Sequence, residues 1–203
     1  LSSNTAVWVI PGEDDAHDMK ITGKQWFWEY EYKDALTWED DPDITYIDVD
    51  WSGTALTVTS TNAAAVNVSI QKGSDSLPST SLDTVTGEAL AEVTFDPYKH
   101  SIVEVTDADG NVLHTWMHIP RLHVFSSALG EDMILPCDEA VVFEMHSAPS
   151  DDSNPNYIGV QHSFWLPEWG VKEDLVPGIE DGTYMTITAD DPGTFPIRCA
   201  EYC

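Results

Sequence analysis

Apolar and β-branched residues recur along the chain in short runs that turn-forming residues separate. Runs rich in valine, isoleucine, threonine and aromatic side chains are typical of β-strands. They occupy residues 45–49, 55–59, 66–70, 102–106, 112–116, 140–145 and 183–188. Helical periodicity is nearly absent, so the pattern predicts an all-β protein built as a sandwich of two antiparallel sheets.

The segments between the runs predict turns and loops. Residues 107–111, Asp-Ala-Asp-Gly-Asn, predict a hairpin turn, because an Asp-Gly pair tolerates the positive φ that such a turn requires. Residues 72–88 are rich in Ser, Thr, Asp and Gly, which predicts an exposed loop. No segment has the composition of an interdomain linker, so the 203 residues are expected to form a single domain.

An aromatic run near the start of the chain alternates with a period of two. It reads Gln-Trp-Phe-Trp-Glu-Tyr-Glu-Tyr over residues 25–32, so Trp26, Trp28, Tyr30 and Tyr32 share one face of a strand. A core strand explains part of this stripe. Four amphipathic aromatic side chains nevertheless exceed what a sandwich core needs, so at least one is expected at a surface used by a partner.

The charge of the chain predicts a strongly acidic surface. With 36 Asp and Glu residues against 8 Lys and Arg, the formal net charge is -28. Such a chain repels phosphate backbones and anionic lipid, which argues against nucleic-acid binding. Disorder is excluded by 42% hydrophobic residues and 8 tryptophans. A folded body coated with carboxylates predicts adaptation to concentrated salt; an unusually acidic protein from an ordinary habitat is the alternative.

Neither a membrane span nor a disulfide framework is predicted. No stretch approaches the roughly 18 apolar residues that cross a bilayer, and no signal-peptide pattern opens the chain. The chain runs from Leu1 to Cys203, and both ends are expected to be cut. Its 3 cysteines are an odd number, and two of them lie close together in Cys-Ala-Glu-Tyr-Cys. That arrangement favours metal chemistry over a disulfide framework.

The cysteine pair Cys199 and Cys203 follows a turn at residues 190–193 and a predicted strand over residues 195–198. On a tight loop both sulfurs can reach one centre, although a structural zinc pair or a local disulfide fits the spacing as well. His162 lies upstream and precedes an apolar, proline-bounded stretch. One imidazole and two thiolates form a soft ligand set that suits copper.

Three sequence blocks together resemble subunit II of the cytochrome c oxidases, in the order that this family has them. They read GKQWFWEYEY from residue 23, HSFWLPEWGVKEDLVPG from residue 162 and CAEYC from residue 199. The resemblance implies a cupredoxin-like Greek-key β-sandwich with a dinuclear copper centre of the CuA type. Cys199 and Cys203 would then bridge two copper ions, and His162 would be a terminal ligand.

The same resemblance implies roles for two further residues. Glu201 would offer its backbone carbonyl to copper and its side chain to a magnesium or manganese ion at the boundary with oxidase subunit I. Trp26 would receive the electron from a cytochrome c or a small blue copper protein, and haem in subunit I would accept it. The chain would thus be an electron-transfer subunit of a salt-adapted, haloarchaeal terminal oxidase. It would lie on the outer face of the cell membrane and would not catalyse alone.

The chain also departs from the family pattern. The family has a second His four residues beyond the last Cys, a Met three residues further on and two membrane helices before the first block, none of which this chain contains. Its middle, about residues 33–135, is longer than in the family and carries no assigned motif. The expectation is therefore a single cupredoxin domain over residues 1–203 with an enlarged middle region.

Three other kinds of protein compete with this interpretation. A copper-free quinol-oxidase subunit II would not need both cysteines and His162. Nitrous oxide reductase carries a similar copper motif, but its large propeller has no room in this chain. A mononuclear copper-binding or zinc-binding cupredoxin module remains the third alternative.

Five residues outside the blocks could also carry chemistry. His114, His118 and His123 allow a second metal site, but ordinary surface or interface histidines are favoured. Cys137 has no neighbours at metal-site spacing and is expected to be a buried thiol. His146, on a strand that leads toward the site loop, is the best candidate for an additional ligand.

Overall fold

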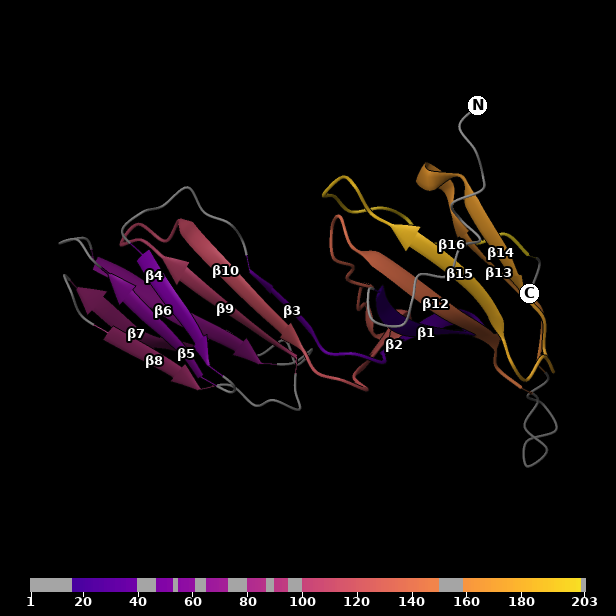
Figure 1. The fold of residues 1–203 in the computed structure, drawn as a ribbon, viewed down its shortest axis with the longest axis horizontal. Coiled ribbons are helices and arrows are strands. Elements are labelled where there is room, and N and C mark those ends of the chain that lie inside the picture. The colour runs from indigo at the N-terminus through magenta and orange to yellow at the C-terminus, as the bar shows by residue number, and fades with distance from the viewer. Residues whose placement is uncertain are drawn as a thin grey trace. The chain divides into compact units, whose positions relative to one another are not determined.

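The computed structural model describes residues 16–39, 47–52, 55–60, 65–72, 80–86, 90–94, 100–149 and 159–201. In this part of the chain the regular elements are β-strands and two 3-10 turns, η1 (Ser127–Leu129) and η2 (Pro167–Trp169), so the prediction of an all-β fold is confirmed. The chain divides into two compact units (Figure 1). Unit 1 comprises residues 1–34 and 124–203, and unit 2 comprises residues 35–123.

The described strands of unit 1 form two sheets. The larger has the order β11-β2-β1-β12-β15 and is formed by β1 (Ala16–Lys24), β2 (Phe27–Tyr32), β11 (Val124–Ser126), β12 (Ala140–Ser147) and β15 (Thr183–Thr188). The smaller has the order β14-β13-β16 and is formed by β13 (His162–Leu166), β14 (Val171–Leu175) and β16 (Arg198–Cys199).

The core of unit 1 lies between these sheets because every second residue of the central strands is apolar. Burial alternates along β2, where Trp28, Tyr30 and Tyr32 are buried and the residues between them are half-buried. The buried face of the larger sheet also includes Met19, Ile21, Val141, Phe143, Met145, Met185 and Ile187. Phe164 of the smaller sheet packs edge-on against Trp28 and Phe143. The result is the expected cupredoxin-like β-sandwich.

Two details of unit 1 differ from the sequence-based expectation. β1 and β12 pair in parallel, with Ile21 opposite Met145, so the larger sheet is mixed rather than antiparallel. A parallel pair needs a long crossover, and more than a hundred residues separate these strands in sequence. The strand predicted over residues 195–198 is also wrong: regular pairing begins only at Arg198, two residues beyond Pro196, which has no N–H to donate.

The described strands of unit 2 also form two sheets. One has the order β3-β10-β9-β6-β7 and the other β4-β5-β8. Their strands are β3 (Leu36–Glu39), β4 (Ile47–Ser52), β5 (Ala55–Ser60), β6 (Ala65–Lys72), β7 (Thr80–Thr86), β8 (Leu90–Thr94), β9 (Ser101–Thr106) and β10 (Val112–Ile119). The exposed loop predicted over residues 72–88 is therefore wrong in part, because Thr80–Thr86 pairs with β6 despite its polar composition.

The predicted hairpin turn at residues 107–111 is confirmed between β9 and β10. Asp107 Oδ1 accepts hydrogen bonds from the backbone N–H groups of Asp109 and Asn111, and Gly110 has a φ of 85°. These bonds hold the pKa of Asp107 below its usual value, the hydrogen bond from the Asn111 side chain having the largest effect. That units 1 and 2 belong to a single cupredoxin domain stays a prediction.

Candidate metal centre

His162 is the first residue of β13, and its side chain enters the core of unit 1. It is only 3% exposed. Its ring lies edge-on to Trp28, with the ring centroids 5.7 Å apart. Burial lowers the pKa of the His162 imidazole, because desolvation disfavours the charged form. This shift favours the neutral form of the ring, which is the form that binds metal ions.

The pairing of β13 with β16 brings Cys199 to this histidine. Phe164 lies opposite Cys199, and the Ala200 N–H donates to the carbonyl of Ser163 at 3.0 Å, which continues the antiparallel ladder toward His162. As a result, Cys199 Sγ lies 4.0 Å from His162 Nδ1. The Cys199 thiol also lies 3.7 Å from the backbone carbonyl oxygen of Glu201.

The chemistry and spacing of these three groups fit a transition-metal ion. Imidazole nitrogen and thiolate sulfur bind at about 2.0 Å and 2.3 Å, so a tetrahedral ion between them separates the two atoms by about 3.5 Å, close to the observed spacing. Among the residues that the structure describes, no group of three or more His, Cys, Asp or Glu side chains is placed to hold a metal. Cys203, the other predicted thiolate ligand, lies outside the described residues.

The candidate centre opens into a cavity of about 1010 Å³ within unit 1. His162 and Cys199 are in its wall together with Trp26, Trp28, Trp169 and Phe195. Trp26 precedes β2 and is 80% exposed, whereas Trp28 is 7% exposed. Three members of the aromatic stripe, Trp28, Tyr30 and Tyr32, therefore belong to the core. Trp26 is the one member of the four that lies at the surface.

A tyrosine of β2 fixes the loop that forms another wall of this cavity. Tyr32 is buried, and its hydroxyl donates to the carbonyl of Ile134 and accepts from the N–H of the same residue, both at 2.8 Å. Its ring packs edge-on against Phe125. Burial raises the pKa of Tyr32, so its hydroxyl keeps its proton and both hydrogen bonds persist at any physiological pH.

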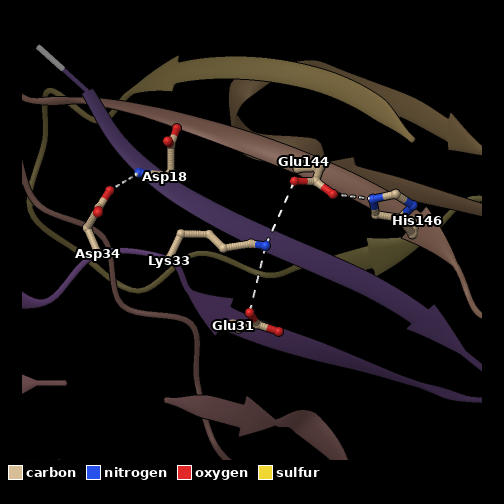
Figure 2. A network of polar contacts seen from close by, with 6 residues as sticks. All are labelled: Asp18, Glu31, Lys33, Asp34, Glu144 and His146. Atoms are coloured by element: carbon tan, nitrogen blue, oxygen red, sulfur yellow. Dashed lines mark hydrogen bonds and ion pairs between the residues drawn. The ribbon is translucent and has the colours of Figure 1, made fainter. Parts of the chain in front are cut away.

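His146 lies on the other face of the larger sheet. It follows Met145, which is buried, and its Nε2 is hydrogen-bonded to Glu144 Oε1 at 2.6 Å (Figure 2). His162, by contrast, packs on the inner face. The structure therefore does not bring His146 together with the candidate centre.

The network around His146 also includes a lysine. Lys33 Nζ lies 3.8 Å from Glu31 and 4.0 Å from Glu144, and Figure 2 shows it between the two carboxylates. Partial burial raises the pKa of Glu144, but the hydrogen bond with His146 and the charge of Lys33 together lower it by more than burial raises it. The pKa of Glu144 therefore lies below its ordinary value.

The remaining sequence-predicted residues have other surroundings. Cys137 is exposed, so the expectation of a buried thiol is wrong; its backbone forms a bridge with Ala189 at the surface of unit 1. His114 is 5% exposed and packs edge-on against Trp116, so it is a core residue of unit 2 rather than a surface histidine. His118 forms a hydrogen bond with Thr37.

Two residues that contact His162 were missed in the sequence. Trp28 was recognised only as part of the aromatic stripe, and Gly23 was not singled out. A glycine inside a strand often marks a site where another group approaches the backbone closely, so Gly23 did carry a usable signal. Which group approaches it depends on the opposite sheet and could not be derived from local sequence.

Comparison with known proteins adds to this geometry. No protein-family profile matches the chain. The chain is 42% identical over 74 residues to a cytochrome c oxidase subunit 2 of Alkalihalophilus pseudofirmus, covering 36% of this chain and 18% of the relative. A protein of the same name from Synechocystis is 41% identical over 44 residues, covering 22% and 13%. One from Thermostichus vulcanus is 41% identical over 62 residues, covering 30% and 18%.

These matches are partial. They span less than a fifth of the length of each of these relatives. In the part of the chain that the structure describes, no helix has the length and apolar character needed to cross a bilayer. Over 22–36% of its length, this chain is similar to subunit 2 of cytochrome c oxidases, which supports the family resemblance seen in its motifs.

Proposed function

We propose that this chain is the copper-bearing domain of subunit II of a respiratory haem-copper oxidase and carries electrons to the haem of subunit I. The observation that carries the proposal is the 4.0 Å approach of Cys199 Sγ to the Nδ1 atom of the buried His162. A neutral imidazole and a sulfur ligand at this spacing suit a soft transition metal. The similarity to cytochrome c oxidase subunit 2 supports the same assignment.

The family resemblance implies the ligand roles, and the approach of Cys199 to His162 supports two of them. The His162 imidazole and the thiolates of Cys199 and Cys203 would hold the copper, and the Glu201 carbonyl, near the Cys199 sulfur, would be a further ligand. The Glu201 side chain would face a magnesium or manganese ion at the boundary with subunit I. Copper of the CuA type would supply a one-electron couple shared over two ions and two sulfurs.

The chain's own residues would control access to this couple. Trp26, exposed beside the cavity that His162 and Cys199 line, would be the contact point for a cytochrome c or a small blue copper protein. The buried ring of His162 and the aromatic wall around it exclude water from one side of the centre, which limits solvent reorganisation on electron transfer. The domain would lie on the outer face of the cell membrane.

The two compact units fit this function unequally. Unit 1 contains every described residue of the candidate centre, and unit 2 lies between its two chain segments in sequence. We therefore propose that residues 35–123 are an insertion that enlarges the middle of a single cupredoxin domain. The net charge of -28 supports a salt-adapted source for the whole chain.

Absorption spectroscopy of the protein tests the proposal. The protein is expressed from its complete gene, loaded with copper and partially oxidised. A purple mixed-valence spectrum is expected. A blue spectrum would assign a mononuclear copper site, and a colourless protein that retains zinc would assign a zinc module; either result would refute the dinuclear centre.

Cysteine variants supply the matched control. Cys199→Ser and Cys203→Ser remove a soft ligand and should abolish the purple bands. Cys137→Ser removes an exposed thiol outside the candidate ligand set and should leave the bands unchanged. Bands lost in Cys137→Ser but kept in Cys199→Ser would show that the ligands have been misassigned.

A further inference from the structure

Gly23 lies within β1, where the backbone does not require a glycine. It is not among the residues with positive φ, and its neighbours in the strand pair regularly with both β2 and β12. A glycine inside a strand weakens it, so its presence here needs another reason. That reason must be the space that its missing side chain leaves.

The space beside Gly23 is filled by the candidate ligand. A Cβ atom at Gly23 would lie 2.8 Å from both Cγ and Cδ2 of His162 and 3.0 Å from Trp28 Cζ3. Distances under 3.0 Å are essentially never tolerated by a real Cβ, so the imidazole would have to move. The His162 ring therefore rests directly on the backbone of the opposite sheet.

Trp28 closes the other side of this notch. It is the cross-strand partner of Gly23, so its indole extends from the neighbouring strand over the position where the glycine has no side chain. The indole meets His162 edge-on at 5.7 Å and Phe164 edge-on at 5.4 Å, and Phe164 in turn packs on Phe143. These contacts on several sides leave the indole little freedom to shift.

We propose that Gly23 and Trp28 are positioning residues that fix the direction of the His162 imidazole toward Cys199 and thereby set the affinity of the centre for copper. The copper part rests on the proposed function. The backbone at Gly23 limits the ring from one side and the indole from another, which leaves Nδ1 pointing to the sulfur at 4.0 Å. Groups that orient a metal ligand typically change affinity about 10- to 100-fold when they are removed.

A double-mutant cycle without metal tests the packing. The variants Gly23→Ala, His162→Ala and the double variant are compared by their thermal unfolding midpoints. Hydrogen exchange, measured separately, then reports the stability of unit 1. Gly23→Ala alone should lower the midpoint by about 3–10 °C, as expected for overpacking in a chain of this size. In the His162→Ala background the loss should fall to less than half, because the added methyl group then occupies vacated space.

A neighbouring position provides the control for this cycle. Thr22 precedes Gly23 on β1 and points to the opposite face of the sheet, so Thr22→Ala should cost the same in both backgrounds. Equal losses for Gly23→Ala in the two backgrounds would overturn the inference, because the methyl group would then not be competing with the His162 ring.

Copper titration of the metal-free protein tests the consequence for the centre. Gly23→Ala and Trp28→Leu should weaken copper binding at least tenfold, whereas Trp28→Phe, which keeps an aromatic wall, should recover part of the loss. Unchanged affinity in Gly23→Ala would overturn the positioning role. Absence of copper binding in the unaltered protein would refute the proposed function and the copper part of this inference, while the metal-free cycle would still decide whether Gly23 and His162 are coupled.

Discussion

The hydroxyl of Tyr32 offers the most direct measure of how firmly the cavity wall is held. Tyr32→Phe removes one oxygen from a side chain that is 2% exposed and leaves the ring in place. That oxygen satisfies both the carbonyl and the N–H of Ile134, each at 2.8 Å. The variant therefore leaves a backbone donor and acceptor of the loop at residues 131–137 without this partner.

The expected cost follows from these two bonds. A partly buried backbone group that loses its hydrogen-bond partner lowers the stability by about 1–3 kcal/mol. Both groups belong to the same residue and regain water together, so the two costs are not added. We therefore expect Tyr32→Phe to destabilise unit 1 by about 1–3 kcal/mol. For a chain of roughly 200 residues each kcal/mol shifts the unfolding midpoint by about 2–4 °C.

Because the chain contains two compact units, the assay must report on unit 1 alone. Native-state hydrogen exchange does so, with the Ile134 amide as the local probe and the amides of β1 as the probe of the whole unit. Tyr184→Phe is the control, since Tyr184 is 42% exposed and its loss should stay within about 0.5 kcal/mol. If the two variants exchanged alike at Ile134, the double hydrogen bond would not be what holds the loop.

Three further predictions concern charge, backbone space and electron entry. Because the folded pKa of Glu144 lies below its unfolded value of about 4.3, its carboxylate stabilises the fold above that pH, and the contribution is lost as pH falls through the folded pKa. Glu144→Gln should therefore destabilise the protein at pH 7, and the difference from the unaltered protein should shrink as the pH falls below about 4.3, as denaturation across a pH series will show. Gly170→Ala should lower the free energy of unfolding by only roughly 1–2 kcal/mol, the strain of a left-handed non-glycine residue, because a Cβ there meets open space. Gly182→Ala should lower it clearly more in chemical denaturation, because its Cβ would lie 2.9 Å from a backbone oxygen. Equal losses in the two variants would contradict the steric argument. In molar salt, where the Debye length is about 3 Å, Trp26→Ala should slow reduction by the natural donor at least tenfold in stopped flow while Glu29→Gln changes it little; the reverse result would show that charge guides docking.

The faces of the central strands follow closely from the sequence. A period of two places Trp28, Tyr30 and Tyr32 on one face, and these three are buried. The alternation does not say which strands pair, because pairing depends on segments far apart in the chain. The parallel pairing of β1 with β12 was missed for that reason, and β7 was missed because its Ser- and Thr-rich sequence resembles a loop.

Solvent exposure of single residues was predicted less well than the faces of strands. Cys137 was expected to be buried from its residue type and surroundings in sequence, yet it lies in a surface segment whose position is fixed by its bridge to Ala189. The exposure of Trp26, by contrast, agrees with the expectation that at least one member of the aromatic stripe lies at a surface, and it arises because β2 begins only at Phe27. Alternation predicts exposure only where a strand continues, and the end of a strand depends on its partners.

The candidate centre shows where local sequence stops being informative. His162 and Cys199 could be selected by ligand chemistry alone, since imidazole and thiolate are recognisable wherever they occur. Gly23 has no chemistry of its own, and its effect arises only because the opposite sheet delivers the His162 ring onto its backbone. A ligand can therefore be predicted from its residue type, whereas the residue that orients it is identified only after both sheets are in place.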